Sequence, residues 1–340
     1  MRISIITPAA AGARNGNRNT ASRWAHFLRE LGHGVKVEQQ WSGVQCDVMI
    51  ALHARRSFDS IRRYSEACPD RPLVVVLTGT DVYRDIHTDA DAKLALELAS
   101  RLIVLQDMAT KELRASLRRK TRVIYQSARA VERPAPLSGC FEVIVSGHLR
   151  PEKDPFRSAA ALAHLPDGSR IRITHVGGAL TPDLAAEARR WMAREPRYRW
   201  LGEMAHGRAL RMLARARLMV ISSRMEGGAN VICEALRSGV PVVASKVSGN
   251  IGMLGPRYPG YYPVGDEGAL ARLLHRAECD RSYYERLAES CAARAPLVAP
   301  ERERLALDEL MSELQPRERV NVRAVGRAAR GIALKNPLVR

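Results

Sequence analysis

The stretch LMVISSRMEGGANVICEALRSGVPVVASK, residues 218–246, has the pattern of a strand, a loop, a helix and a second strand. The apolar residues at 218–223 and 241–246 form two short, nearly continuous runs, and a helical segment is expected between them at 229–238. Such apolar runs, joined by a helix, are typical of parallel strands that are buried on both faces of a sheet. The stretch therefore predicts a unit of an α/β fold.

The same alternation of strands and helices runs along most of the chain and is interrupted once. Strands are expected before the interruption at 3–7, 47–52, 73–78, 101–106 and 122–127, and after it at 141–147, 171–178, 199–202, 218–223, 241–246 and 261–264. The interrupting segment, 129–140, contains Pro134, Pro136 and Gly139 and reads as a linker. The pattern predicts two Rossmann-like halves with a ligand site in the cleft between them.

These signals divide the chain into five parts. We expect an N-terminal domain over 1–130, a linker over 131–140, a C-terminal domain over 141–298, a helix over 299–315 that packs back near the N-terminal domain, and a basic tail over 316–340.

Composition limits the class of protein. The chain has 340 residues and a net charge of +18, to which the tail contributes seven Lys or Arg residues and one Glu. This charge favours anionic partners, and the tail suggests contact with an anionic membrane or another polyanion. A nucleic-acid-binding protein is not favoured, because four Phe and four Trp offer few stacking platforms.

The six cysteines form no CxxC pair, which argues against both a zinc site and a disulfide framework. We therefore expect a cytoplasmic protein. The first residues are expected to form a strand, and no apolar run is long enough to span a membrane. No dinucleotide cofactor is predicted, because the sequence contains neither GxGxxG nor GxxxxGK[ST]. No metal site is predicted, because no segment carries a complete metal-ligand pattern.

The loop and helix within 226–234 carry the clearest chemical signal. The helix is expected to begin at Asn230 or at the glycines before it, so that its unpaired N–H groups attract a phosphate. Glu226 precedes the helix and Glu234 lies more than one turn inside it, so the two carboxylates can reach opposite ends of one ligand. Carboxylates accept hydrogen bonds from pairs of sugar hydroxyls.

Residues 218–249 resemble the donor-binding signature of the family 4 GT-B glycosyltransferases, in which two glutamates are separated by seven residues. SGHLRPEK at 146–153 resembles the family's phosphate-binding turn, although His148 stands where the family usually has Arg. The resemblance implies a metal-independent UDP-sugar site in which Lys153 holds the diphosphate, Glu234 the ribose and Glu226 the sugar. The donor-binding residues it implies are His148, Arg150, Lys153, Leu201, Gly202, Glu226, Gly227, Gly228, Ala229, Asn230 and Glu234.

The N-terminal half resembles the selenosugar synthases of selenoneine biosynthesis, at residues 15–33, 50–61, 74–86 and 104–106. That resemblance implies transfer of a sugar from UDP-GlcNAc or UDP-glucose to selenophosphate, with formation of a C–Se bond. A small trianion needs several cationic or polar ligands. The expected acceptor-binding residues follow strands on the cleft side, and they are Gly16, Asn17, Thr20, His53, Arg55, Arg56, Thr78, Gly79, Thr80 and Arg84.

The roles expected for the catalytic residues follow from this reading. Lys153 stabilises the departing diphosphate, Glu226 fixes the sugar, and His53 or Asp81 orients groups or moves a proton. Thr20 is expected to cap the first helix. Three alternatives remain at this stage: a family 4 glycosyltransferase acting on a hydroxyl acceptor of the envelope or a small molecule, a UDP-sugar epimerase, and a hydrolase.

Overall fold

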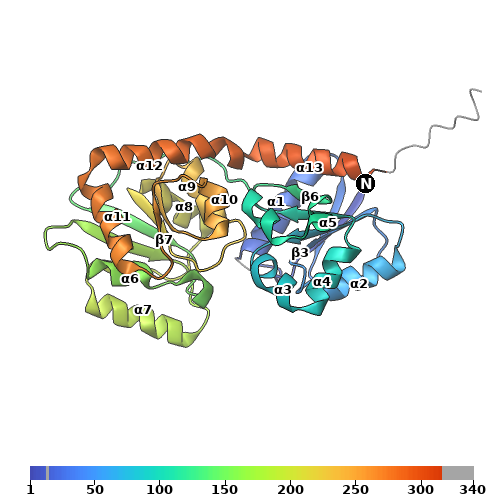
Figure 1. The fold of residues 1–340 in the computed structure, drawn as a ribbon, viewed down its shortest axis with the longest axis horizontal. Coiled ribbons are helices and arrows are strands. Elements are labelled where there is room, and N and C mark those ends of the chain that lie inside the picture. Colours follow the sequence, from blue (N-terminus) through green and yellow to red (C-terminus); the bar gives the residue numbers. More distant parts are fainter. Residues whose placement is uncertain (13–14, 316–340) are drawn as a thin grey trace, which may run out of the picture.

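The computed structural model describes residues 1–12 and 15–315, which form two α/β domains lying side by side (Figure 1). The basic tail and its suggested membrane or polyanion contact fall at 316–340, outside the described residues. No described helix is both long and apolar enough to cross a membrane.

The N-terminal domain is built on a sheet of six parallel strands in the order β2-β1-β3-β4-β5-β6. The strands are β1 Arg2–Ile6, β2 Gly34–Glu38, β3 Val48–Leu52, β4 Leu73–Leu77, β5 Arg101–Val104 and β6 Thr121–Val123. The helices are α1 Gly16–Glu30, α2 Phe58–Ala67, the π-helical turn η1 Asp81–Asp85, α3 Ile86–Thr88, α4 Ala90–Leu98, the 3₁₀ helix η2 Asp107–Glu112 and α5 Ala115–Arg118.

The C-terminal domain has a second sheet of six parallel strands, in the order β12-β11-β10-β7-β8-β9. Its strands are β7 Phe141–Ser146, β8 Ile171–Val176, β9 Tyr198–Trp200, β10 Leu218–Ile221, β11 Val242–Ser245 and β12 Tyr261–Tyr262. The helices that follow β7 are η3 Pro151–Lys153, α6 Arg157–Leu162, α7 Pro182–Arg194, α8 His206–Arg215, α9 Asn230–Arg237, α10 Ser248–Leu254, α11 Glu267–Cys279, α12 Arg281–Arg294, η4 Ala295–Val298 and α13 Pro300–Leu314.

Two parallel sheets, each covered by helices, define the GT-B fold that the sequence predicted. Strands β3 and β4 are buried at every position, and this explains why their apolar runs were easy to recognise. The last two helices, α12 and α13, run along both domains (Figure 1). Helix α13 places Leu307, Leu310, Met311 and Leu314 in the apolar core that contains Ile3 and Trp24 of the N-terminal domain.

Some elements differ from the prediction, for identifiable reasons. Strand β2 was missed because Lys36 interrupts its apolar pattern and this edge strand is only partly buried. Helix α10 was missed because its glycines disfavour helix formation.

The predicted capping role of Thr20 was wrong. Helix α1 begins earlier than expected, and the side chain of Asn15 accepts a hydrogen bond from the Arg18 N–H at 3.1 Å. Thr20 lies inside the helix, where its hydroxyl donates to the carbonyl oxygen of Gly16 at 2.9 Å.

The two domains approach each other closely where α10 meets η2 and the end of β5. A Cβ added to Gly252 of α10 would lie 1.9 Å from Oε1 of Gln106 in the N-terminal domain. Gln106 is fully buried and is held by a hydrogen bond to Tyr83 at 2.6 Å, so it has little freedom to move away. Glycine is therefore required at position 252 for this packing of the domains.

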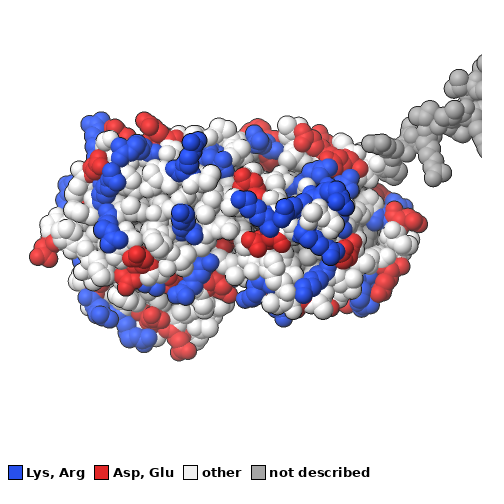
Figure 2. Space-filling model, viewed as in Figure 1, with Lys and Arg blue, Asp and Glu red and all other residues white. Residues whose placement is uncertain are grey.

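Basic and acidic side chains are mixed over the face of the molecule shown in Figure 2, which is the face seen in Figure 1. On this face, Lys and Arg gather on the N-terminal domain around α5 and β6. Several of these cations have partners within the protein: Arg122 pairs with Glu313 at 3.0 Å, and Arg114 pairs with Glu97. The positive charge of this region is thus partly neutralised.

Candidate active site between the two domains

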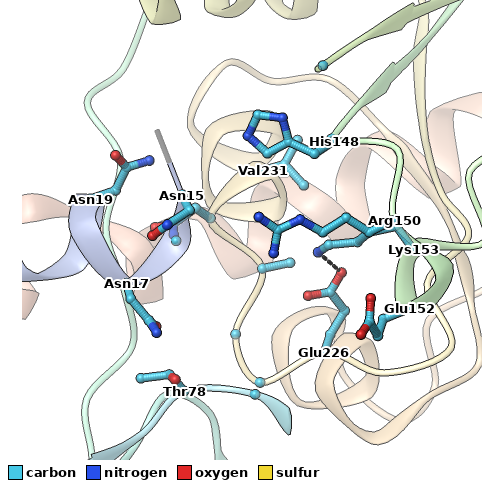
Figure 3. A pocket seen from close by; sticks show the side chains of 18 of the residues that line it. Asn15, Asn17, Asn19, Thr78, His148, Arg150, Glu152, Lys153, Glu226 and Val231 are labelled. Carbon is cyan, nitrogen blue, oxygen red and sulfur yellow. Dashed lines mark hydrogen bonds and ion pairs between the residues drawn. The ribbon is translucent and has the colours of Figure 1, made fainter. Parts of the chain in front are cut away.

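A cavity of about 470 Å³ lies between the domains at the carboxyl ends of the two sheets. Residues of α1 and the loops after β3 and β4 line one side, and the loops after β7, β9 and β10 line the other. Figure 3 shows Asn15, Asn17 and Asn19 facing Arg150 and Lys153 across this space. The cavity has the size of an ordinary small-molecule site.

A buried histidine, His175, fixes the start of the loop from Gly147 to Lys153. The Nε2 of His175 on β8 contacts the Gly147 carbonyl oxygen at 3.1 Å, and its Nδ1 contacts the Tyr198 hydroxyl at 2.9 Å. Burial lowers the pKa of His175 to about 4, so the ring is neutral near pH 7. We infer that Nε2 donates and Nδ1 accepts, because the Gly147 carbonyl can only accept.

Arg150 and Lys153, the two cationic residues of this loop, line the cavity. The guanidinium of Arg150 extends over Lys153 into the space (Figure 3). Its Nε is buried and has no hydrogen-bond partner in the described part of the chain. A buried donor without a partner is costly, which makes Arg150 well suited to bind an anionic ligand. His148 also lines the cavity, and its Nδ1 accepts from the Gly178 N–H at 3.0 Å.

Glu226 and Lys153 form an ion pair in the cavity. The Glu226 carboxylate also accepts a hydrogen bond from the Ser223 hydroxyl, and its side chain is only 7% exposed. The backbone of Lys153 is fixed in turn, since the Ser222 hydroxyl donates to its carbonyl oxygen at 2.9 Å. Lys153 and Glu226, which the sequence assigns to the diphosphate and to the sugar, thus lie in contact with each other at the cavity.

Glu234 lies on α9, just after the first turn of the helix, and lines the same cavity. Burial raises the pKa of its carboxyl group to about 7, and the positive charge of Arg23 opposes this shift. The Nε2 of His206 lies 3.8 Å from its Oε1. Glu234 therefore changes charge near neutral pH, unlike an ordinary surface glutamate.

The two sides of the cavity touch at Gly227. A Cβ at this position would lie 2.1 Å from the carbonyl oxygen of Thr78 in the other domain. Gly227, Gly228, Ala229 and Asn230, which the sequence assigns to the donor site, all line the cavity. The structure also gives a reason for glycine at 227, because no side chain fits between the loops after β4 and β10.

His53 stands at the end of β3 with a φ of 71°, a left-handed conformation that costs energy for a residue with a side chain. Its Nδ1 accepts from the Arg56 N–H at 3.3 Å, which leaves Nε2 to donate to the Thr80 hydroxyl at 3.1 Å. Burial lowers the pKa of His53, although the negative charge of Asp81 opposes this shift. A neutral His53 thus orients the Thr80 hydroxyl at the cavity.

Asp81 is fully buried and does not line the cavity. Its carboxylate accepts hydrogen bonds from the backbone N–H groups of Thr78 at 2.9 Å, Gly79 at 2.7 Å and Ala54 at 3.1 Å. These contacts hold together the loops after β3 and β4. The geometry favours this supporting role over the proton transfer considered for Asp81 from the sequence.

The three arginines expected at the acceptor side are placed differently. Arg56 lines the cavity. Arg55 does not line it and pairs instead with Asp89 at 2.9 Å, while Arg84 pairs with Asp85 at 2.9 Å and is also absent from the lining. Of these three arginines, the structure thus leaves Arg56 on this wall of the cavity.

Most of the other predicted residues reach the cavity. Gly16, Asn17, Thr78 and Gly79 line it, whereas Thr20, Leu201 and Gly202 do not. The loop after β9 contributes Glu203 and Met204 in place of Leu201 and Gly202. The lining residues that sequence reasoning missed include Asn15, Asn19, Gln126 and His206. Asn15 carried a recognisable signal, since Asn is a preferred N-cap residue.

Potential metal ligands occur elsewhere in the described chain. His275, Glu278 and Cys279 on α11 bring their ligand atoms within 4.8 Å of one another. None of the three lines the cavity, so the cluster adds nothing to the site between the domains.

Comparisons with known proteins agree with this architecture. The chain has the GT-B fold, and residues 131–294, which include most of the C-terminal domain, match the family model described as "Glycosyl transferases group 1". No curated protein matches the sequence.

Solved structures share the fold over most of the chain. The Anabaena protein Alr3699/HepE, in complex with UDP and glucose, has a TM-score of 0.73 at 21% identity, covering 92% of this chain and 100% of its own. Sucrose-phosphate synthase of Thermosynechococcus elongatus has a TM-score of 0.71 at 17% identity, covering 92% of this chain and 98% of its own. A UDP-forming α,α-trehalose-phosphate synthase of Burkholderia vietnamiensis has a TM-score of 0.66 at 14% identity, covering 94% of this chain and 80% of its own.

The role of Asp81 is testable by its effect on stability. Replacing Asp81 by Asn should lower the free energy of unfolding by about 2–3 kcal/mol, because a buried carboxylate that accepts three N–H groups is lost. Chemical denaturation measures the change. The same substitution at the exposed Asp70 is the control and should have little effect. Equal stability of Asp81→Asn and the wild type would contradict the assignment.

Proposed function

We propose that this protein is a glycosyltransferase that transfers a sugar from a UDP-sugar to selenophosphate and forms a C–Se bond. One observation carries the proposal. The cavity joins a wall that bears Arg150, Lys153, Glu226 and Glu234 to a wall that bears Arg56 and the Thr78 to Thr80 loop. The first wall suits a nucleotide sugar and the second a small anion.

The donor side contains the groups that a UDP-sugar needs. Arg150, Lys153 and the N-terminal N–H groups of α9 can share the charge of a diphosphate without a metal. We expect Glu234 to accept hydrogen bonds from the ribose hydroxyls and Glu226 to accept them from the sugar. The presence of UDP and glucose in the similar HepE structure supports UDP as the nucleotide.

The acceptor side favours an anion. None of the described residues forms an ion pair or hydrogen bond with the Arg56 guanidinium, so its charge is available at the cavity. The Thr80 hydroxyl, oriented by His53, and the backbone of Gly79 provide further polar contacts on the same wall. Selenophosphate carries more than one negative charge that such a site can bind, whereas an alcohol is neutral.

The proposed reaction is a displacement at the anomeric carbon. The selenium of selenophosphate forms a bond to this carbon as the bond to the UDP oxygen breaks, and UDP leaves with the electron pair. Arg150, Lys153 and α9 stabilise the charge that develops on UDP. The first product is a sugar selenophosphate, and water then cleaves its P–Se bond to give the selenosugar and inorganic phosphate.

A hydroxyl acceptor is the second candidate, and one observation favours it. Asn15, Asn17 and Asn19 line the acceptor wall beside Arg56, and neutral amides are good partners for hydroxyl groups. Under this alternative the donor side would act in the same way, and selenophosphate would not stimulate UDP formation.

Two neighbouring arginines provide a matched test of the acceptor. UDP formation from UDP-GlcNAc or UDP-glucose should be faster with selenophosphate than without it, and mass analysis should detect a selenium-containing sugar. Arg56→Gln should raise the KM for selenophosphate about tenfold or more, because a charged hydrogen bond is lost. Arg55→Gln should resemble the wild type, since Arg55 faces Asp89.

Orthophosphate in place of selenophosphate is the control for general anion effects. If selenophosphate does not increase the rate of UDP formation, the proposed acceptor is wrong. If Arg55→Gln and Arg56→Gln change the KM equally, the placement of the acceptor at Arg56 is wrong.

The binding of UDP should depend on pH through Glu234. Because burial raises the pKa of this group to about 7, the carboxylate that accepts the ribose hydroxyls is present above that pH and is protonated below it. Lowering the pH from about 8 to about 6 should therefore raise the Kd for UDP about tenfold. Isothermal titration measures this change.

Glu234→Gln is the control for the titration of UDP itself. It should bind UDP more weakly than the wild type at about pH 8, and its Kd should follow only the ionisation of the UDP phosphate. Wild type and variant with the same pH dependence would show that Glu234 does not contact the nucleotide.

A further inference from the structure

Helix α13 carries a buried carboxylate, Glu303, that faces the N-terminal domain. Its side chain is 0% exposed. It accepts hydrogen bonds from Arg23 Nε at 2.7 Å and Trp24 Nε1 at 2.6 Å, both on α1, and from the Ser127 N–H at 2.8 Å in the segment between the domains. Separating α13 from α1 would leave this buried carboxylate without its hydrogen-bond donors, which is energetically costly.

Arg23 extends this set of contacts to the other domain. Its Nη1 donates to Oδ1 of Asn230 at 3.2 Å, and its Nη2 donates to Oε1 of Gln126 at 3.2 Å. Asn230 is the first residue of α9, and both Asn230 and Gln126 line the cavity. The contacts therefore run from α13 through α1 to the helix expected to receive the donor diphosphate.

Both helices that Arg23 joins contribute to the cavity. Helix α1 begins at its edge with Gly16 and Asn17, and α9 begins there with Asn230. A Cβ added to Gly16 would lie 3.7 Å from Nδ2 of Asn230, so the two helix N-termini are close neighbours. A fixed contact between α1 and α9 sets the distance between the acceptor and donor walls.

An arginine is suited to this position because its planar guanidinium has several donors in fixed directions. Nε contacts α13, Nη1 contacts α9, and Nη2 contacts both Glu303 and Gln126. A lysine ammonium places a single charged nitrogen there and cannot reproduce this pattern.

We propose that Arg23 is a positioning residue of the transfer reaction, held by Glu303 and acting through Asn230. It fixes α9 against α1 and so aligns the donor with the acceptor. Attachment of α13 to the N-terminal domain does not itself require these polar contacts, because Leu307, Leu310, Met311 and Leu314 already pack in the apolar core. The effect on catalysis rests on the proposed function.

Hydrogen exchange tests the contact without relying on activity. In Arg23→Lys, amides of residues 226–236 should exchange at least about tenfold faster than in the wild type, while the strands of both sheets keep their protection. Glu303→Gln should show the same pattern, since it removes the charge that holds Arg23. Unchanged exchange at 226–236 in both variants would overturn the proposal.

Glu313 provides a control on the same helix. It accepts from Arg101 at 3.2 Å and Arg122 at 3.0 Å, and none of these three residues lines the cavity. Glu313→Gln should therefore leave exchange at 226–236 unchanged. Faster exchange in this variant as well would indicate a general effect of loosening α13 and would count against a specific role of Arg23.

Kinetics then distinguish positioning from binding. With UDP-GlcNAc and selenophosphate, Arg23→Lys should lower kcat about tenfold or more, while its Kd for UDP stays within about threefold of the wild type, because the residues expected to bind UDP are intact. A weakened Kd with unchanged kcat would contradict positioning. Absence of turnover in the wild type would instead contradict the proposed function and leave the exchange result as the test of Arg23.

Discussion

The architecture depends on one constraint, the burial of both faces of two parallel sheets. Strands such as Val48–Leu52 and Leu73–Leu77 have no exposed residue, so each must be followed by a crossover that covers a face of the sheet. Parallel strands then end at the same edge. The polar loops after β3, β4, β7 and β10 therefore gather at one edge of each sheet, and the two edges together enclose the cavity.

Buried polar side chains give these loops their exact positions. Asp81 binds the backbone of the loops after β3 and β4, His175 supports the loop at Gly147, and Glu303 holds Arg23 against the start of α9. Each of these side chains is nearly or fully buried. Such groups act behind the residues that face a ligand, and a few of them determine how the two walls of the cavity meet.

The sequence predicted the fold well because strand burial leaves a direct trace in composition. Where burial was incomplete, as at β2, or where glycines served packing between domains, as in α10, the trace was lost. On the donor side, the sequence could predict the position of Arg150, Lys153 and Glu226 because they follow strands, and that of Glu234 because it lies just inside the helix that begins at the cavity. On the acceptor side, sequence order could not separate Arg56 from Arg55, because adjacent residues in a turn point in different directions. The pairing of Glu303 with Arg23 was also beyond reach, since the two residues are distant in the sequence and meet only through the packing of α13.

The central claim is that the cavity between the domains is a nucleotide-sugar site with its diphosphate on the C-terminal wall. A crystal structure of the protein with UDP tests this claim most directly. The account predicts that the phosphates contact Arg150, Lys153 and the first N–H groups of α9, and that the ribose hydroxyls contact Glu234. UDP bound elsewhere, or in this cavity with its phosphates away from Arg150 and α9, would contradict it.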